Sequence, residues 1–590
     1  MPTVAYSVSM HRPKTHLLDV TIELSGLAGA SFDLVMPAWT PGSYKIRDYA
    51  RHVQDFSAGR LRWRKEDKGR WRVMTGGADR ARATYRVYAF EMNARGAHLD
   101  ADHGYLNGAA VFMYLDGAKD RPITLGLRIP SGWRVATGLR PAGRAYTAAD
   151  YDELVDCPIE AGRFELVKWR TRGIEHRLAL HGRVNRPLGR IAKDLAKIVE
   201  SESRMFGGLP YPDYTFLLHT APGIYGGLEH RNSTSLEFSS AGFRKREDYE
   251  NFLELAAHEY FHLWNVKRIR PSMLGPFDYE REVHTTLLWA MEGFTSYYDG
   301  LFLVRAGLTT RDRYLKKAAK RWQAFVDKPG RRHHGLGASS FDAWIKYYQP
   351  TEHSPNATVS YYEKGEFVGM ALDLEIRRRT RNRRTLDDVL RRLYRRVESE
   401  GAGFPEAEYR RACEEMAGGS LAEFWRDYID GTRELPLERF LGHAGLGFRR
   451  EPAKEEGESK PPRSPWIGAI VQRAGSQLSV ATVRSDSPAE RAGLCARDEI
   501  LAIDGARVDM ETWERRVEEL KPGRPARLAV FRAGALREIS LVPEMRDATV
   551  LKIVSLSKAD ALQKSIHRSW LGQPWKPQPE SRVKSRESRV

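Results

Sequence analysis

The chain contains the segment His258-Glu259-Tyr260-Phe261-His262, and residues 251–257 before it carry apolar side chains at helical spacing without proline or glycine. This pattern predicts a buried helix that runs into the segment. Residues four apart lie on one face of a helix, so both imidazoles can face one metal ion while Glu259 lies beside them. We therefore predict that His258 and His262 bind zinc, one ion per chain, and that Glu259 is the catalytic base of a zinc peptidase.

The length of 590 residues is too great for one hydrophobic core, and we expect about three or four domains. A content of 41 % hydrophobic and 29 % charged residues is typical of a soluble globular protein. The sequence has no apolar run long enough to span a membrane, and residues 1–7 lack the charged and then apolar pattern of a signal peptide. We therefore expect a cytoplasmic protein without a membrane span.

The three cysteines, Cys157, Cys413 and Cys495, are far apart in the sequence, which argues against a disulfide framework or a cysteine-based zinc site. The net charge of +18 is spread over helical segments such as residues 377–379 and 391–392. Such a distribution favours a solvated basic surface over a nucleic-acid interface.

The first part of the chain alternates polar and apolar residues, as in residues 15–24, 32–36 and 83–90. This period of two predicts a β-sandwich-like domain over residues 1–168. From about Gly189 the period becomes helical, which predicts an α-rich catalytic domain over residues 169–448 with a strand at 214–218. The fold class that we expect is multidomain α+β.

The C-terminal part begins with a charged, proline-rich stretch, residues 449–464, which we interpret as a linker. Residues 465–545 have the pattern of a compact unit of strands and one helix. Residues 546–590 are basic and rich in proline near their end, and we expect this tail to be disordered, with a docking role as the alternative.

A catalytic zinc ion needs a third protein ligand, and Glu292 is the best candidate. It is the only carboxylate in the apolar helical stretch 287–298, where burial would be costly without a cation. We therefore expect a site with two histidines and one glutamate. The alternative is a glutamate on the exposed face of an amphipathic helix.

Residues 258–271 together with Glu292-Gly293-Phe294-Thr295 resemble the glycyl aminopeptidase family of gluzincins, which are zinc peptidases with a PDZ module. The resemblance extends to residues 37–44 (Pro-Ala-Trp-Thr-Pro-Gly-Ser-Tyr) and implies a thermolysin-like catalytic domain. The 29 residues between His262 and Glu292, numbers 263–291, favour this family over the larger leukotriene A4 hydrolase-related one, where the connection is shorter. Family membership alone implies a preference for N-terminal glycine or another small residue.

Two further elements complete the predicted site. Gly226 and Gly227 let the backbone approach an extended peptide, and Glu229 offers a carboxylate to a free α-ammonium group. The segment resembles the exopeptidase motif of the larger family, with two departures: leucine replaces methionine, and His230 replaces asparagine. By resemblance to a Tyr-x-Lys-Gly element of related gluzincins, Tyr362 would donate a hydrogen bond to the oxyanion.

Residues 464–471, 487–494 and 498–505 resemble a PDZ domain of the bacterial protease type. The resemblance implies that peptide C-termini bind at Trp466-Ile467-Gly468-Ala469 by adding a strand to the sheet edge. Docking of this module on the catalytic domain is an equal alternative.

The leading hypothesis is a zinc aminopeptidase acting on peptides. A related endopeptidase or amidase, in which Glu229 does not bind an α-amine, and a PDZ-based peptide-binding scaffold are the other possibilities. An aminopeptidase would fail on N-acetylated peptides, which separates the two enzymes.

Overall fold

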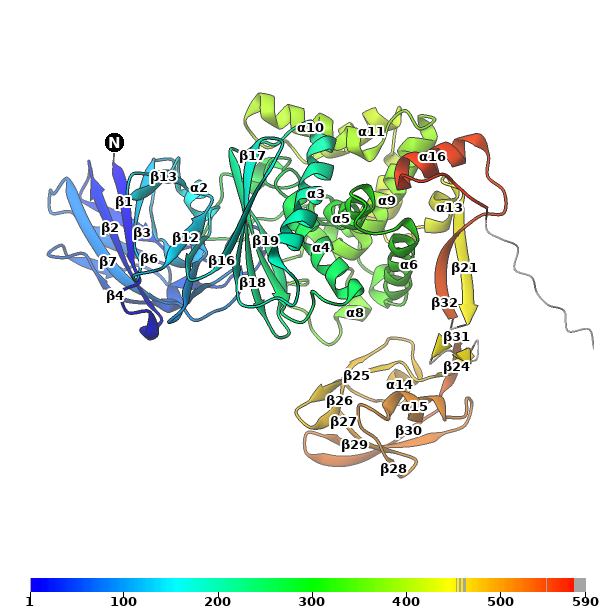
Figure 1. Cartoon of the computed structure of the whole chain (residues 1–590). Helices are drawn as coiled ribbons and strands as arrows, with labels where there is room; N and C mark the ends of the chain where they lie inside the picture. The colour runs from blue at the N-terminus through cyan, green and yellow to red at the C-terminus, as the bar shows by residue number, and fades with distance from the viewer. Residues whose placement is uncertain (1, 453, 456–457, 460–462, 548, 578–590) are drawn as a thin grey trace, which may run out of the picture. The chain divides into compact units, whose positions relative to one another are not determined.

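Three sheets form the N-terminal region in the computed structural model, which describes residues 2–452, 454–455, 458–459, 463–547 and 549–577 (Figure 1). The largest sheet has seven strands in the order β13-β14-β11-β1-β2-β7-β4. In chain order they are β1 (Thr3–Ser9), β2 (Leu17–Ser25), β4 (Val53–Ser57), β7 (Arg80–Tyr88), β11 (Ile123–Arg128), β13 (Arg140–Ala142) and β14 (Ala145–Ala148). Alternate residues of β2, such as Leu18, Val20 and Ile22, are buried, so the predicted period of two is confirmed.

Two four-stranded sheets complete this region. One has the order β10-β3-β6-β5 and contains β3 (Ser31–Val35), β5 (Trp63–Lys65), β6 (Arg70–Met74) and β10 (Tyr114–Leu115). The other has the order β12-β15-β9-β8 and contains β8 (Ala97–Leu99), β9 (His103–Leu106), β12 (Arg134–Thr137) and β15 (Ile159–Gly162). One apolar core of the N-terminal region includes Val8, Ile22, Trp71 and Phe112. The predicted β-rich N-terminal domain is therefore confirmed.

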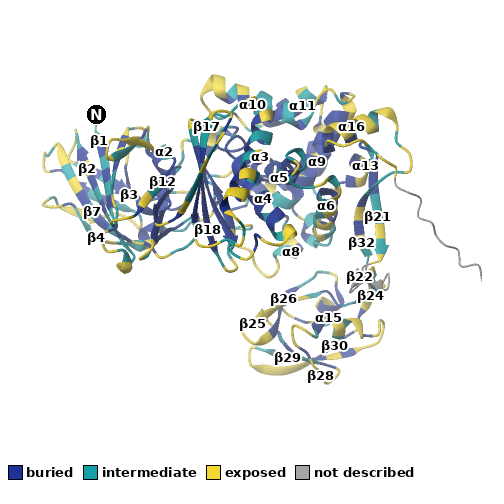
Figure 2. Ribbon diagram, viewed as in Figure 1, coloured by how far each residue is buried: buried dark blue, intermediate teal, exposed yellow. Residues whose placement is uncertain are grey.

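A five-stranded sheet packs against the helix that carries the segment His258–His262. Its order is β16-β17-β18-β20-β19, from β16 (Glu165–Thr171), β17 (Ile174–His181), β18 (Asp213–Ala221), β19 (Tyr225–Glu229) and β20 (Ser233–Ser239). Helices α3 (Leu188–Phe206) and α4 (Arg246–Phe261) pack on one side of it (Figure 1). β18 is buried along nearly its whole length, as its dark colour in Figure 2 shows, because it lies inside the sheet.

The rest of the catalytic region is helical, as predicted. Around α9 (Tyr361–Arg379) pack a π-helical turn, η4 (Trp289–Gly293), and helices α6 (Arg311–Val326), α7 (Leu336–Phe341) and α13 (Leu437–Gly442). The helices α5 (Phe294–Arg305), α8 (Ser354–Ala357), α10 (Leu386–Glu400), α11 (Ala407–Ala417) and α12 (Ala422–Phe424) and the π-turn η6 (Trp425–Asp430) complete the region. Among the described residues, no helix is both long enough and apolar enough to cross a membrane.

The C-terminal module is a small β domain with its own core of Ile467, Val480, Ile500, Leu528 and other apolar residues. Its strands are β24 (Arg463–Trp466), β25 (Ala469–Ala474), β26 (Gln477–Val483), β27 (Glu499–Ile503), β28 (Ala506–Arg507), β29 (Ala526–Arg532), β30 (Ala535–Leu541) and β31 (Glu544–Asp547), and its helices are α14 (Pro488–Arg491) and α15 (Trp513–Glu518). β25 lies at one end of the main sheet.

The expectation of a disordered tail over 546–590 is wrong for its described part. β32 (Thr549–Ser555) pairs with β21 (Leu446–Pro452), so the predicted linker also begins inside a strand. Helix α16 (Ala561–Leu571) follows and buries Ile566 and Trp570 completely. These apolar residues are four apart on one helix face, a pattern that the basic composition of the tail obscures. The described residues do not include 578–590 of the tail. They also leave out 453, 456–457 and 460–462 of the predicted linker.

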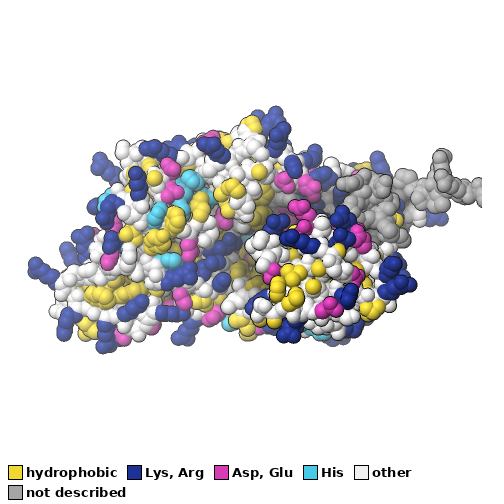
Figure 3. Space-filling view, turned by 90° about the horizontal axis from the view of Figure 1, so that it is seen from below, with side chains coloured by type: hydrophobic (Ala, Val, Ile, Leu, Met, Phe, Trp, Pro, Cys, Tyr) yellow, Lys and Arg dark blue, Asp and Glu magenta, His cyan; other side chains and the backbone are white. Residues whose placement is uncertain are grey.

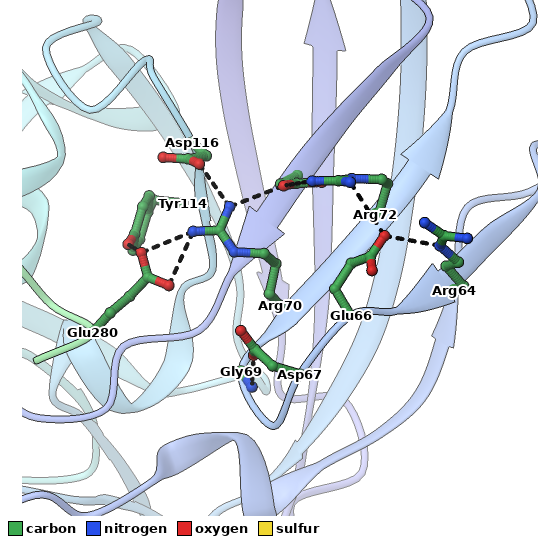
Figure 4. Close-up of polar contacts among 10 residues, drawn as sticks. Arg64, Glu66, Asp67, Gly69, Arg70, Arg72, Tyr114, Asp116 and Glu280 are labelled. Carbon is green, nitrogen blue, oxygen red and sulfur yellow. Dashed lines mark hydrogen bonds and ion pairs between the residues drawn. The ribbon is translucent and has the colours of Figure 1, made fainter.

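Charged side chains cover much of the surface. Figure 3 shows lysine and arginine side chains across the visible face, with acidic side chains among them. A more ordered arrangement surrounds Arg70 on β6, whose guanidinium contacts Asp33, Asp116 and Glu280 at 2.9, 2.6 and 2.9 Å (Figure 4). Arg72 also binds Asp33, and the hydrogen bonds from Arg72 and Arg70 lower the pKa of this carboxyl. The Arg70 cluster thus joins β3, β6 and the segment around Glu280, which follows His262 in the sequence.

From the contacts of Arg70 we expect Arg70→Met to destabilise the fold. Because Asp33 has only 10 % of its side chain exposed, removing Arg70 should lower the free energy of unfolding by about 1–3 kcal/mol. Arg64→Met is the matched control, since Arg64 is 64 % exposed and should matter little. Denaturant unfolding measures both variants, and equal effects would contradict the role of Arg70.

The loss of unfolding free energy in Arg70→Met should depend on pH. The folded pKa of Asp33 is lowered, so its contribution to stability is complete above the ordinary carboxyl pKa of about 4 and is lost as the pH falls through the lower folded value. The difference between Arg70→Met and the wild type should therefore shrink below about pH 4.

Candidate active site

Helix α4 carries the motif as predicted. It ends at Phe261, and His262 is its C-terminal cap residue. The helix packs on β19 and β20 through a nearly continuous buried surface that includes Phe252, Ala256 and Tyr260. The packing holds the two histidines and Glu259 in or near the interior, with Glu259 only 6 % exposed.

Each histidine has a partner for its Nδ1 atom. His262 Nδ1 lies 2.7 Å from the carbonyl oxygen of Asn265, and His258 Nδ1 lies 3.3 Å from Asp299 Oδ2. Since a carbonyl oxygen only accepts hydrogen bonds, Nδ1 of His262 must donate, and its Nε2 atom keeps a lone pair. A carboxylate beside His258 favours the same tautomer. Both contacts therefore prepare the rings for metal ligation.

Glu292 lies in the π-helical turn η4, which continues directly into α5. The extra residue of a π-turn changes which side chains share a helix face, and such turns are frequent at functional sites. Asp299, the partner of His258, follows Glu292 on α5. One ligand atom each from His258, His262 and Glu292 lie within 4.8 Å of one another, so the predicted ligand set comes together.

A second group of side chains adjoins the first. Ligand atoms of Glu229, Glu259 and His262 also lie within 4.8 Å of one another. Glu229 is the last residue of β19, the edge strand of the five-stranded sheet in the described part of the chain, and is only 4 % exposed. The predicted α-amine binder is therefore adjacent to the predicted base and to one metal ligand.

Two glycines permit this close packing. A Cβ atom on Gly227 would overlap the Glu259 carboxylate, so that glycine makes room for the base. A Cβ atom on Gly42 would lie 2.6 Å from Glu229 Oε1, and Gly42 has a φ of +86° that also favours glycine. The loop around Gly42, from the N-terminal region, thus lies directly against Glu229. The sequence indicated neither contact.

Other residues around Glu229 were also missed from the sequence. Arg95 donates a hydrogen bond of 2.7 Å to the carbonyl oxygen of Gly227 and so holds β19 in place. Trp39, Tyr44 and Lys267 border a small cavity beside Glu229. Trp39 and Tyr44 belong to the 37–44 stretch, whose importance was visible only through family resemblance.

Tyr362 lies at the start of α9, which packs closely on η4. Gly293 and Gly365 meet there, and a Cβ atom on either would clash with backbone of the other helix. Burial, followed by the charge of Glu292, raises the pKa of Tyr362 well above its usual value, so the phenol stays protonated as a donor. Tyr361 is completely buried, whereas Tyr362 is partly exposed.

Two other ionisable groups lie buried near these elements. Glu202 on α3 is completely buried, and burial, followed by the charge of Asp299, raises its pKa well above the usual carboxyl value. Burial lowers the pKa of Lys364 to about 8. The raised pKa favours the protonated, uncharged form of Glu202 and so reduces the negative charge near His258.

Three protein-family models match parts of the chain. Residues 5–163 match a model described as the peptidase M61 N-terminal domain, residues 251–368 match the M61 glycyl aminopeptidase, and residues 459–542 match a PDZ domain. An aminopeptidase N family protein from Idiomarina loihiensis is 30 % identical, with a TM-score of 0.89, and the match covers 96 % of this chain and 100 % of that one. The chain belongs to the M61 glycyl aminopeptidase family. It is a metallopeptidase with a C-terminal PDZ domain.

More distant structures share less with this M61 peptidase. An M1 zinc metallopeptidase from Deinococcus radiodurans is 15 % identical with a TM-score of 0.46, over 74 % of this chain and 94 % of that one. No curated protein matches the chain.

The close contact at Gly227 predicts a specific defect. Gly227→Ala should displace the Glu259 carboxylate and lower kcat about 100-fold, because misplacing a catalytic group by about 1 Å has effects of this size. Gly189→Ala on α3 is the control, since a Cβ atom there would have no other atom within 4 Å. Steady-state kinetics of both variants test this. Full activity in Gly227→Ala would show that Glu259 has no fixed position there.

Proposed function

We propose that this M61 peptidase is a zinc-dependent aminopeptidase that removes single residues from the free N-terminus of peptides. The observation that carries the proposal is the position of Glu229, whose carboxylate lies within 4.8 Å of ligand atoms of Glu259 and His262. A carboxylate so close to the reaction centre can bind the α-ammonium group of a peptide whose first peptide bond is being cleaved. An endopeptidase would need this space for further substrate residues.

The donor set fits zinc. Two imidazoles and one carboxylate, from His258, His262 and Glu292, are the ligands of many catalytic zinc sites, and three ligands leave a position for water. Bound zinc would lower the pKa of that water and polarise the scissile carbonyl. The buried Glu229, Glu259 and Glu292 carboxylates concentrate negative charge, which a divalent cation would offset.

In this proposal, side chains of the protein transfer the proton, bind the substrate and stabilise the oxyanion. Glu259 accepts the proton of the attacking water and can pass it to the leaving amine. Glu229 fixes the substrate N-terminus, and the edge strand β19 offers its backbone to an extended peptide. Tyr362 donates its phenolic proton to the developing oxyanion. The family description supports glycine or another small residue as the one removed.

The PDZ domain supports a second peptide-binding role. The edge strand β25 follows the Trp466-Ile467-Gly468-Ala469 loop and could accept a peptide C-terminus as an added strand. Other contacts favour docking of this domain on the helical region. Asn356 on α8 bonds with the carbonyl of Val483 at 2.8 Å and the amide of Ser485 at 3.0 Å, and Arg484 donates to the carbonyl of Asp327 at 2.8 Å. Docking and peptide binding are compatible, because these contacts lie at the last residue of β26 and just after it and do not involve β25.

A cleavage profile across X-Ala amides tests the proposed reaction. The wild type should release X as a single residue, fastest for small X, and Glu259→Gln should lose at least about 1,000-fold in kcat because the proton acceptor is gone. Mass spectrometry of products from longer peptides identifies the bond. Internal cleavage, or unchanged turnover in Glu259→Gln, would refute the proposal.

Tyr362→Phe tests the oxyanion donor against a close internal control. Its kcat should fall by about 100- to 1,000-fold with little change in KM, since the lost hydrogen bond forms in the transition state. Tyr361→Phe, one position earlier and completely buried, should retain activity within a few fold. The reverse ranking would assign the donor to Tyr361.

A further inference from the structure

A cluster of histidines and carboxylates lies apart from the site described above. His103 starts β9 and Glu160 lies on β15 of the β12-β15-β9-β8 sheet, while His181 ends β17 and His219 lies on β18 of the five-stranded sheet. His181 and His219 are register partners on adjacent strands. A small apolar core including Tyr105, Ala179 and Leu217 packs between the same two sheets. The cluster therefore lies where two sheets meet.

The ligand atoms of three of these residues are close together. His103, Glu160 and His181 offer one atom each within 4.8 Å of one another. The rings of His103 and His181 are stacked with centroids 3.5 Å apart and an interplanar angle of 17°. Two imidazoles and a carboxylate are ligand types of zinc sites. An imidazole binds a metal through a lone pair that lies in the plane of its ring, so one of the two stacked rings must rotate before both can bind the same ion.

Three polar atoms of this cluster have no hydrogen-bond partner in the described part of the protein. His103 is 1 % exposed, and neither ring nitrogen makes a hydrogen bond, although Nδ1 lies 3.4 Å from Asp100 Oδ1. Glu160 is also 1 % exposed, and its Oε1 atom has no hydrogen-bond partner. Buried polar groups normally have partners, so these three atoms indicate that a bound group completes the site.

The surrounding residues orient the potential ligands. His219 Nε2 lies 2.8 Å from Glu160 Oε2, which leaves Oε1 directed elsewhere. Asp100 accepts hydrogen bonds from the amides of Asp102 and His103 and fixes the start of β9. Burial lowers the pKa of His103 to about 3 and that of His181 to about 4, so both rings are neutral at pH 7 and carry a lone pair for a metal.

We propose that His103, Glu160 and His181 bind a second, structural zinc ion that joins the N-terminal sheet to the five-stranded sheet. Nitrogen and carboxylate ligands together suit zinc better than calcium or magnesium, which prefer oxygen ligands only. The sequence predicted one ion per chain, because these three residues are separated by 57 and 21 positions and form no recognisable spacing. The ion would hold β9, β15 and β17 together.

Zinc counting on the full chain tests this proposal. Protein loaded with zinc and dialysed should contain two ions per chain in the wild type and one in His181→Phe, where the phenyl ring preserves stacking on His103. Peptidase activity of His181→Phe should stay within a few fold of the wild type. His333→Phe, at an exposed histidine, should keep both ions. A single ion in the wild type, or no loss in His181→Phe, would overturn the second site.

A second variant separates this site from the proposed catalytic one. His258→Ala/His262→Ala should lose activity yet retain one zinc ion, and added zinc should raise its melting temperature. Adding His181→Phe to that variant should abolish both the remaining ion and the thermal shift. Glu160→Gln, nearly identical in shape, should weaken zinc binding without loss of fold. Binding that is unchanged by both His181→Phe and Glu160→Gln would assign the ion elsewhere.

Discussion

The site depends on the burial of several carboxylates against two histidines. Glu229, Glu259 and Glu292 are each at most 6 % exposed, and the first two lie within 4.8 Å of the same histidine, His262. Like charges in a poorly solvated interior repel one another, so compensating cations would stabilise this arrangement. A divalent metal and the ammonium group of a substrate are the two cations that the proposed function supplies. The charge of the site therefore agrees with the proposed function.

Several features of the backbone and its surroundings allow these carboxylates and histidines to lie so close together. Gly227 and Gly42 lack the side chains that would displace Glu259 and Glu229, and the π-turn η4 carries Glu292. Asn265 and Asp299 hold the outer nitrogens of the histidines. The N-terminal region contributes Gly42 and Arg95 to the surroundings of Glu229, so it forms part of the site as well as a separate fold.

Sequence reasoning predicted the helix of the motif, the family and the fold class, because each depends on local spacing or on several motifs in one order. The ligand set remains a prediction, and its three residues lie close together. Sequence reasoning missed the π-turn, because residues 287–298 are apolar almost throughout and a shift of one residue therefore leaves no visible change in the pattern. Contacts such as Arg95 with Gly227 join residues 132 positions apart and have no local signal. The wrong expectation of disorder over α16 had another cause. The basic, proline-containing composition of the tail was given more weight than the helical spacing of Ile566 and Trp570.

The role of Glu229 is the central claim, and a comparison of free and N-acetylated forms of one peptide amide tests it most directly. The wild type should prefer the free form by a large ratio of kcat/KM, and Glu229→Gln should reduce that ratio by at least about tenfold, the effect of losing one charge-assisted contact. If Glu229→Gln lowers kcat/KM but leaves the ratio of free to acetylated substrate unchanged, Glu229 does not bind the α-amine and the account is wrong.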